Sequence, residues 1–513
     1  MVSDNGVNAL VPRPRKHIEG NTLCSLAESL TIEHNYPKCF ILIDALKVFN
    51  ERLLMRQQQR LYNESETLHI NTMTIVTEDS CDESENKLWP SEYMDESYKI
   101  SIFDGKIEIE CNEVWGALHA LQSIIQLVHR GKSGSDAMAV VKMNVFHWHM
   151  TDDSSFPYAS STYPELSLEG AYHPRKLVYE NADVVHVIEF ARLRGIRVMV
   201  EFDTPSHTKS WERSHPEIRT DCNNRGHLGP FNPANETTFE FLKAFFKEVT
   251  SVFPEPFIHL GGKEVSFDCW ESNTEISKFM KEKEFGNDYE KLESYYFDRL
   301  IEAIQSVQPD GYAITPVVSH EVFQNGYRVI HTFNTSLNVY YTAMYTHIKG
   351  NDSARMMTFN SRFQEKRNKV NSKPNKTTVI NVWKCKSWPK LVKSITAAGY
   401  RVIVSSCWRI SPSIHANRWY DYHECDIGAF GGTEEEQKLV IGGEAIALGE
   451  NVDDSNLFLR SWPEGAVVAD RLWSREKSTI VEMKQRLEEL RCHMRDLGFK
   501  VKPINEPKSC LQP

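Results

Sequence analysis

The chain lacks the long apolar run that a membrane span requires. Its 513 residues contain no stretch of about 18 apolar residues. The N-terminal segment carries the basic stretch Pro12-Arg-Pro-Arg-Lys16 and no apolar core, so no secretory signal is visible. An excess of basic charge is also missing: the net charge is −11, which argues against nucleic acid as the main partner. These absences favour a globular enzyme or binding protein.

Two kinds of catalytic site are disfavoured because parts of their motifs are missing. No G-x-S-x-G segment occurs, which argues against a Ser-His-Asp hydrolase. His147 and His149 lie two residues apart, so on a strand they would face one side, and Asp152 follows them. No third ligand follows at a recognised metal-site spacing. We therefore expect no metal and no other cofactor.

The chain is long enough for two domains, and its pattern changes along its length. Of its residues, 41% are hydrophobic and 11% aromatic, which is enough for a large core. Residues 1–35 are polar and irregular and are expected to form a tail. Residues 36–128 are expected to form a smaller α+β domain. Its expected elements are helices over 40–59 and 115–128 and strands over 75–77, 98–102 and 106–110, the last two joined by the turn Asp104-Gly105.

Residues 129–513 alternate between helix and short apolar strand. Such βα units indicate a parallel sheet, and this length predicts a (β/α)8 barrel. One helix is expected to begin at a capping Asn181 and to end at Gly195. Strands are expected to begin near residues 143, 196, 257, 313, 378, 401 and 439, so the first of eight strands is expected to be missing before residue 142. Residues 327–372 break the alternation and are expected to be an inserted, solvated loop.

Polar side chains collect directly after these strands, where catalytic residues of α/β proteins lie. Carboxylates that accept hydroxyl hydrogen bonds and indoles that stack on sugar faces suit a carbohydrate site. Glu264 is the best candidate for an acid. The structural explanations are that His147 belongs to the core, Asp203 caps a turn and His207 is a buried histidine. The full set of candidates is His147, Trp148, His149, Asp152, Asp203, His207, His259, Lys263, Glu264, Trp383, Trp408 and Glu450.

Five segments closely resemble the β-N-acetylhexosaminidases of glycoside hydrolase family 20, the lysosomal hexosaminidase α/β-subunit type. The similarity runs from about residue 36 to residue 510 and implies a (β/α)8-like barrel behind a smaller α+β domain. The segments are Met143-Asn-Val-Phe-His-Trp-His-Met-Thr-Asp-Asp153, Ala191-Arg-Leu-Arg-Gly-Ile-Arg197, Glu201-Phe-Asp-Thr-Pro-Ser-His207, His259-Leu-Gly-Gly-Lys-Glu-Val265 and Arg471-Leu-Trp-Ser474.

The resemblance implies removal of terminal GlcNAc or GalNAc from glycoconjugates, with retention of configuration. In this family the substrate's own acetamido oxygen attacks the anomeric carbon, an exception to the two-carboxylate scheme. By motif position, Glu264 matches the general acid/base. The residues that match sugar-pocket positions are Asp152, His207, Trp383 and Glu450.

The resemblance also implies a compartment and partners. Cysteine positions match the disulfides Cys39–Cys81, Cys222–Cys269 and Cys492–Cys510, which implies an oxidising compartment such as the lysosome or the secretory route. Members of the family often form dimers, so a homo- or heterodimer is a possible assembly, with terminal sugars of glycans or glycolipids as ligands. N-glycosylation triplets give this route weak support; they begin at Asn63, Asn235, Asn334, Asn351 and Asn375.

Lys263 is the largest departure from the family pattern, which has an Asp before the acid. That Asp accepts a hydrogen bond from the acetamido N–H and stabilises a cationic intermediate, whereas Lys can only donate. The lost charged hydrogen bond costs about 1.5–3 kcal/mol. A like charge at about 4 Å adds up to roughly 4 kcal/mol at an effective dielectric of 20. Together these two effects predict a reaction slowed by roughly three to five decades. The ammonium also favours the ionised form of Glu264 over its acid form, which weakens it as an acid.

Other pocket positions differ as well. Ser319, Arg409 and Leu448 stand where the family has aromatic residues, and Arg130 is not expected to replace the sugar-binding Arg of the absent first strand. Two interpretations follow: a glycosidase with impaired activity, or a non-catalytic paralogue that binds glycans or a partner subunit. The lost strand, the insertion and the missing leader are also exon-scale changes that a wrongly assembled gene would produce.

Overall fold

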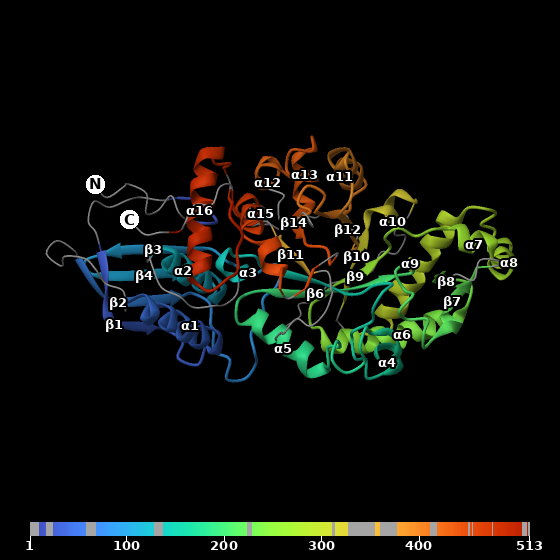
Figure 1. The fold of residues 1–513 in the computed structure, drawn as a ribbon, viewed down its shortest axis with the longest axis horizontal. Helices are drawn as coiled ribbons and strands as arrows, with labels where there is room; N and C mark the ends of the chain where they lie inside the picture. The colour runs from blue at the N-terminus through green and yellow to red at the C-terminus, as the bar shows by residue number, and fades with distance from the viewer. Residues whose placement is uncertain are drawn as a thin grey trace.

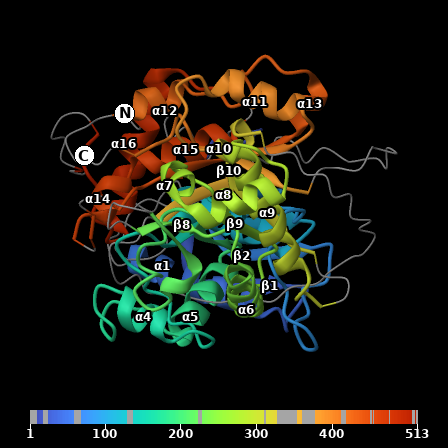
Figure 2. The same ribbon diagram turned by 90° about the vertical axis from the view of Figure 1, so that its right-hand side faces the viewer.

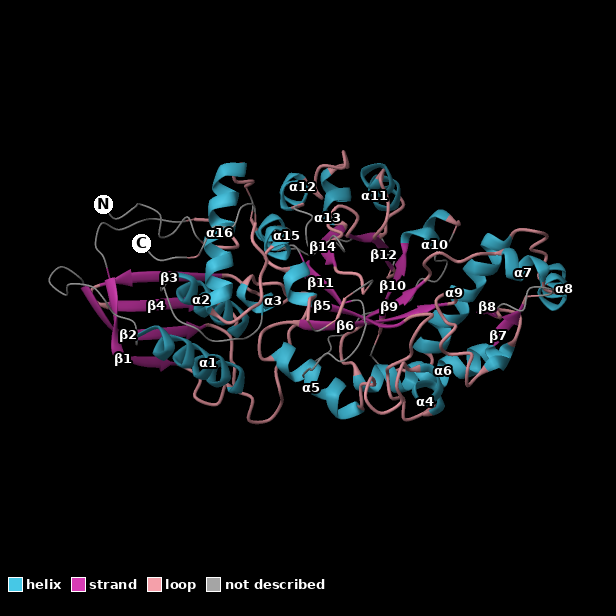
Figure 3. Ribbon diagram, in the orientation of Figure 1, coloured by secondary structure: helices cyan, strands magenta, loops and turns pink. Residues whose placement is uncertain are grey.

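The structure is a computed structural model of the full chain. It describes residues 10–16, 24–57, 68–127, 137–222, 228–309, 313–326, 354–359, 377–410, 418–449, 452–453, 455–474, 476–504 and 510. Figure 1 shows a small sheet domain beside a barrel, as expected. Figure 3 shows that the two domains join near α2, α3 and α16.

The smaller domain is one four-stranded sheet with helices packed on it. The strand order is β1-β2-β4-β3; β1, β2 and β4 are parallel, and β3 is antiparallel to β4. Strand β1 lies within the range expected to be a tail, so the sheet begins earlier than the pattern indicated. The bounds are β1 Cys24–His34, α1 Phe40–Gln57, β2 Leu68–Thr77, β3 Tyr98–Phe103, β4 Lys106–Cys111 and α2 Val114–Leu127.

The expected hairpin between β3 and β4 is confirmed. Asp104 and Gly105 both have a left-handed backbone, with φ of 47° and 73°. This geometry matches the two-residue turn that follows the twist of antiparallel strands, and Gly adopts it without steric cost. Ile107 and Ile109 point into the core while Lys106 and Glu110 are exposed, as the alternation predicts.

The larger domain is a closed barrel of eight strands. Seven of them lie in the expected places, each beginning within two residues of its expected start. Their order around the barrel is β10-β12-β13-β14-β11-β5-β6-β9. The bounds are β5 Val145–Thr151, β6 Arg197–Thr204, β9 Phe257–Gly261, β10 Thr315–Ser319, β11 Ala354–Phe359, β12 Val379–Val382, β13 Arg401–Val404 and β14 Val440–Ile446.

The eighth strand, β11, comes from the segment expected to be a solvated loop. It pairs antiparallel with β14 on one side and with β5 on the other, and so fills the place of the missing first strand. An unpaired edge between β5 and β14 would expose backbone donors and acceptors. The loop expectation was therefore wrong for these six residues, because periodicity cannot reveal a strand whose partners lie far away in sequence.

Helices surround the barrel. Figures 1 and 2 show α11, α12 and α13 on one side and α4, α5 and α6 on the opposite side. Short strands β7 Arg219–Asp221 and β8 Leu228–Phe231 form a separate hairpin. The helix bounds are α3 Ala137–Val140, α4 Glu165–Gly170, α5 Asn181–Arg192, α6 Glu236–Val252, α7 Asp268–Ser272, α8 Thr274–Glu282, α9 Tyr289–Gln305, α10 His320–Gln324, α11 Trp388–Ala397, α12 Trp419–Glu424, α13 Glu434–Lys438, α14 Leu457–Ser461, α15 Glu464–Trp473 and α16 Ile480–Asp496.

Helix α5 shows how local sequence sets one of these elements. Its cap is Glu180 rather than the expected Asn181: Glu180 and Asp183 form a reciprocal capping box. Val184, Val187 and Ile188 are buried as the expected stripe. Gly195, with φ of 69°, follows the helix and turns the chain into β6.

Four disulfides stabilise the fold. The three expected pairs are present: Cys39–Cys81, Cys222–Cys269 and Cys492–Cys510. The fourth, Cys407–Cys425, was not expected; it ties the turn after β13 to the end of α12. Among the residues described, no helix is long and apolar enough to cross a membrane.

Candidate active site

The interior of the barrel changes from apolar to polar along the strand direction. Its lower layer is a hydrophobic cluster of Val145, Met199, Phe257, Val317, Val379 and Ile403. Two residues further along β5, β6 and β9 come His147, Glu201 and His259, all fully buried. Side chains two apart on a strand share a face, so alternate residues of these strands build successive layers. The polar layer is the floor of the candidate site.

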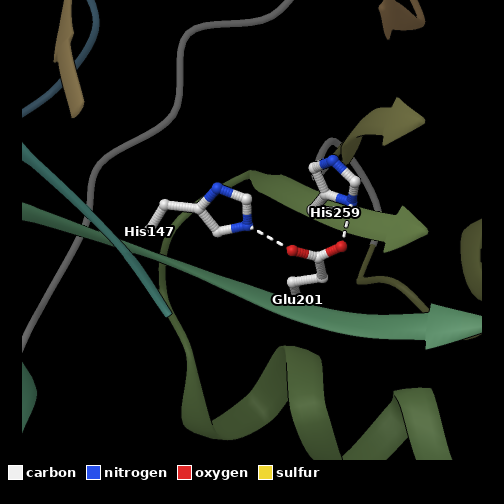
Figure 4. A group of neighbouring side chains, drawn as sticks. All are labelled: His147, Glu201 and His259. Atoms are coloured by element: carbon white, nitrogen blue, oxygen red, sulfur yellow. Dashed lines mark ion pairs between the residues drawn. The ribbon is translucent and has the colours of Figure 1, made fainter. Parts of the chain in front are cut away.

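Glu201 is the centre of this floor. Figure 4 shows its carboxylate between two imidazoles: His147 Nε2 lies 2.8 Å from Oε2, and His259 Nδ1 lies 3.1 Å from Oε1. His149 Nδ1 lies 2.9 Å from Oε2, and the other nitrogen of His147 lies 2.6 Å from Glu444. Burial lowers the pKa of His259 to about 3, so this imidazole is neutral at the pH of any cellular compartment.

Lys263 points into this floor. Its ammonium forms an ion pair with Glu201, lies 3.2 Å from Asp203 Oδ2 and lies 3.5 Å from His149 Nδ1. The side chain is only 3% exposed, and its backbone N–H points at Asp203 Oδ1 across 3.4 Å. The positive charge at this position is therefore compensated by two buried carboxylates.

This arrangement modifies the expected electrostatic effect of Lys263. A bare ammonium would oppose a cationic intermediate with its full charge, but Glu201 and Asp203 cancel most of that field at a distance. The ion pair to Glu264 comes from Lys384 instead, whose Nζ lies 2.5 Å from Glu264 Oε1. An ammonium has no lone pair, so Lys263 cannot accept the hydrogen bond that the family resemblance implies for this position.

Glu264 stands at the mouth of the barrel, above this floor. It follows β9 with a left-handed backbone, φ 51°, and its side chain is 48% exposed. His207, which follows β6, has the same unusual backbone, φ 57°. Its Nε2 lies 3.9 Å from Glu264 Oε2. Such strained residues cost about 1–3 kcal/mol each and cluster at functional sites.

Asp152 links His207 to the floor. Its Oδ1 lies 3.1 Å from His207 Nδ1, and its Oδ2 lies 3.5 Å from His149 Nε2. Burial opposes ionisation of Asp152, but hydrogen bonds to both histidines outweigh it and hold its pKa well below the usual range. Burial likewise opposes protonation of His207, yet Asp152 and the charge of Asp203 raise its pKa to about 9. A histidinium therefore lies beside Glu264.

Trp383, which is 7% exposed, lies beside two lysines: its ring centroid is 5.9 Å from Lys263 Nζ and 5.3 Å from Lys384 Nζ. Its indole N–H points at Ser319 Oγ and Glu321 Oε2, both at 3.1 Å. Ser319 also donates to Glu321. Hydrogen bonds to His320 and Trp383 outweigh burial and lower the pKa of Glu321. Trp383 is thus fixed by polar neighbours rather than by a second indole.

The remaining expected pocket residues lie after β13 and β14. Arg409 is partly exposed, and its carbonyl accepts a hydrogen bond of 2.7 Å from Tyr422. Trp408 is buried and donates to the carbonyl of Tyr422 at 3.1 Å. Leu448 is partly exposed at the end of β14. Glu450 and Arg130 lie outside the described residues.

The structure brings together groups that sequence reasoning did not combine. Glu201 and Glu444 were not singled out, although the period of two along β6 places Met199, Glu201 and Asp203 on one face. Nothing in the sequence indicated that Lys384 would pair with Glu264, apart from its position next to Trp383. Metal-type groupings also appear: the ligand atoms of His147, Glu201 and His259, and those of His149, Glu201 and Asp203, lie within 4.8 Å of one another. Spacing along the chain could not place Glu201 beside His147 and His149, because it comes from the neighbouring strand β6.

Comparisons with known proteins agree with this geometry. Residues 129–326 and 307–476 match the family described as "Glycosyl hydrolase family 20, catalytic domain", and residues 10–127 match "beta-acetyl hexosaminidase like". The beta-hexosaminidase subunit beta of Felis catus is 34% identical over 91% of this chain and 86% of its own length. That of Homo sapiens is 35% identical over 84% and 75%.

Solved structures show the same fold. The chitobiase of Flavobacterium johnsoniae has a TM-score of 0.73 at 20% identity, covering 97% of this chain and 74% of that one. The β-N-acetylhexosaminidase of Streptomyces coelicolor has a TM-score of 0.67 at 15% identity and covers 99% of both chains. With relatives above 30% identity over most of its length and a matching catalytic-domain model, this chain belongs to glycoside hydrolase family 20.

Proposed function

We propose that the chain hydrolyses the glycosidic bond of a terminal, non-reducing N-acetylhexosamine, GlcNAc or GalNAc, with retention. The observation that carries this proposal is Glu264, a half-exposed carboxyl at the mouth of the barrel with His207 and Asp152 behind it. In the substrate-assisted scheme, Glu264 protonates the leaving oxygen while the acetamido oxygen attacks the anomeric carbon. Glu264 then removes a proton from the water that opens the oxazoline-type intermediate.

The neighbours of Glu264 support both steps. The His207 imidazolium is held by Asp152 and lies on the side of Glu264 Oε2, so it stabilises the carboxylate formed after proton donation. Trp383 supplies an apolar face for the sugar ring. We infer that Asp152 also accepts hydrogen bonds from the substrate, since its side chain is 45% exposed.

Lys263 makes this reaction slow. No carboxylate stands at the position that accepts the acetamido N–H, and the ammonium that replaces it is turned into the floor. The lost charged hydrogen bond costs about 1.5–3 kcal/mol, or roughly one to two decades of rate. Because Glu201 and Asp203 compensate the charge, we expect the additional like-charge penalty to be small.

The second candidate function is glycan binding without turnover. Lys263, Ser319, Arg409 and Leu448 favour it, because four positions that shape the acetamido pocket have changed. A non-catalytic paralogue would keep the fold and a sugar contact and would bind glycans or act as a partner subunit.

One assay separates these functions. A chromogenic N-acetyl-β-glucosaminide is incubated at acid pH with the wild type, Glu264→Gln and Lys263→Asp. We expect wild-type turnover to exceed that of Glu264→Gln. Lys263→Asp restores an acceptor but places a third carboxylate beside Glu201 and Asp203, so circular dichroism must first show that it is folded. Turnover of the folded variant should be about 10-fold or more above that of the wild type. Wild-type turnover equal to that of Glu264→Gln, with GlcNAc binding retained in calorimetry, would establish the non-catalytic function.

We also propose a location and an assembly. The four disulfides support an oxidising compartment, the lysosome or the secretory route. Relatives named as alpha and beta subunits support a homo- or heterodimer. Light scattering of the purified chain and peptide mapping without reductant test the two proposals. A monomer, or free thiols at the eight paired cysteines of the native protein, would contradict them.

A further inference from the structure

The ammonium of Lys263 lies in a pocket of three side chains that together have the chemistry of a metal site. His149, Glu201 and Asp203 are respectively 6%, 0% and 1% exposed. All three direct a ligand atom at Lys263 Nζ, and these ligand atoms lie within 4.8 Å of one another. Two carboxylates and an imidazole on rigid strands are a ligand set typical of divalent transition metals.

Asp203 shows that this group needs a cation. Its Oδ2 is buried and receives no hydrogen bond from the described residues; its ion-pair partner there is Lys263 at 3.2 Å. Glu201 would likewise lose its ammonium partner if Lys263 were shortened. Two carboxylates that close to each other, without a cation between them, repel one another in a medium of low dielectric.

The scaffold holds the group rigidly. His149 and Glu201 are directly paired in the register of β5 and β6, and Asp203 lies two residues further along β6 on the same face. The C-terminal turn of β9 is held above them, because Ser206 Oγ donates to the carbonyl of Lys263 at 2.5 Å. Preorganised ligands on neighbouring strands are the condition for tight metal binding.

We propose that His149, Glu201 and Asp203 form a cation-binding cradle in the barrel floor, that Lys263 fills this cradle from within the chain, and that a divalent transition-metal ion occupies it when the ammonium is removed. In the native protein Lys263 is therefore a positioning residue. It neutralises the floor and keeps the turn that carries Glu264 in place. The inference does not depend on whether the chain hydrolyses a substrate.

The test is metal binding by Lys263→Ala, which removes the ammonium and the three methylene groups beyond Cβ. The probes are Co²⁺, followed by its visible absorption, and Zn²⁺, followed by calorimetry and by the melting temperature. We expect Lys263→Ala to bind one ion per chain with micromolar affinity, to show absorption bands of Co²⁺ with an imidazole ligand, and to melt higher with Zn²⁺. Three ligands and a solvent position are a common zinc arrangement.

Matched variants distinguish metal binding in the cradle from metal binding elsewhere on the protein. Lys263→Met fills the same space without a charge, so it should bind no additional ion, and neither should the double variant Lys263→Ala with His149→Ala. A stoichiometry in Lys263→Ala that does not exceed that of the wild type would overturn the proposal. Lys263→Ala could also fail to fold without metal. If it then refolds only in the presence of Zn²⁺, that dependence supports the cradle. If it stays unfolded even with Zn²⁺ while Lys263→Met folds, the proposal is overturned.

Discussion

The floor and the mouth of the barrel contain the same kinds of side chains in opposite environments. Glu201, in the floor, is fully buried and touches three histidines and a lysine. Glu264, at the mouth, is 48% exposed and touches Lys384, which is 51% exposed. A buried ion pair is costly to break because the remaining charge is stranded, whereas an exposed pair is screened by water. Floor residues should therefore control stability, and mouth residues activity.

This difference explains how the barrel tolerates a Lys before the acid. At the mouth, the ammonium of Lys384 already pairs with Glu264, and water screens this exposed pair. In the floor, the ammonium of Lys263 has two buried carboxylate partners and contributes to the fold. Lys263 therefore belongs to the floor of the barrel and not to its mouth.

The largest effect expected in the floor is that of Glu201→Gln. The change leaves Asp203 as the carboxylate partner of Lys263 and replaces one of the two oxygens that face the histidines with an NH2 group, which cannot accept. We expect the free energy of unfolding to fall by about 3–5 kcal/mol, because a buried charge loses its partner. Urea denaturation followed by circular dichroism measures it.

An exposed ion pair provides the control. Glu424 and Lys477 lie 2.5 Å apart with side chains 54% and 38% exposed. Glu424→Gln should change the free energy of unfolding by less than about 1 kcal/mol. Equal losses in Glu201→Gln and Glu424→Gln would show that the distinction between floor and surface charges is wrong.

The corresponding change at the mouth is Glu264→Gln. Loss of a general acid lowers turnover by about 10²–10⁴-fold, while stability should change by less than about 0.5 kcal/mol because the side chain is half exposed. Turnover of a chromogenic N-acetyl-β-glucosaminide and urea denaturation are measured on the same preparation. An unfolded or strongly destabilised Glu264→Gln protein would show that Glu264 controls stability, as the floor residues do.

The sequence predicted the scaffold and the mouth better than the floor. Seven strand positions follow from local alternation and apolar runs, and Asp152, His207 and Glu264 follow from motifs at strand ends. Strand β11 was missed because its pairing with β5 and β14 spans more of the chain than any periodic signal. The direction of the Lys263 side chain also could not be predicted from the sequence.

That direction depends on residues from other strands. Lys263 turns inward because Glu201 and Asp203 on β6 offer carboxylates there, and a local pattern around residue 263 contains neither. The fourth disulfide, Cys407–Cys425, was not predicted for the same reason. Its two cysteines are brought together by the packing of helix α12, which tertiary contacts position. Tertiary partners, rather than local preferences, decided each of these features.

A buried carboxyl outside the floor, Glu293, should make the stability of the protein depend on pH. Glu293 on α9 is 1% exposed, and Asn325 Nδ2 donates a hydrogen bond of 3.0 Å to its Oε2. Burial raises its pKa from an ordinary 4.5 to about 8. The folded protein therefore keeps a proton that the unfolded chain loses above pH 4.5. The stability from Glu293 is complete below pH 4.5 and is lost as the pH rises to about 8.

Glu293→Gln tests this linkage. The variant should match the wild type near pH 4 and be more stable than it near pH 8, by an amount on the order of a few kcal/mol. Melting temperatures between these two pH values give the difference. Glu302→Gln, an exposed change on the same helix, should leave the pH dependence unchanged. Parallel curves for wild type and Glu293→Gln would mean that Glu293 is ionised in the folded protein.

The smallest effect is expected for Lys384→Met, which removes the exposed partner of Glu264. Its Nζ lies 2.5 Å from the carboxylate, but both side chains are about half exposed, so water and salt screen the pair. We expect turnover to change by less than about fivefold, corresponding to about 1 kcal/mol, and this change to shrink as salt is added. A 100-fold change that persists at high salt would show that substrate excludes water from this pair, and that the mouth closes into an environment as dry as the floor.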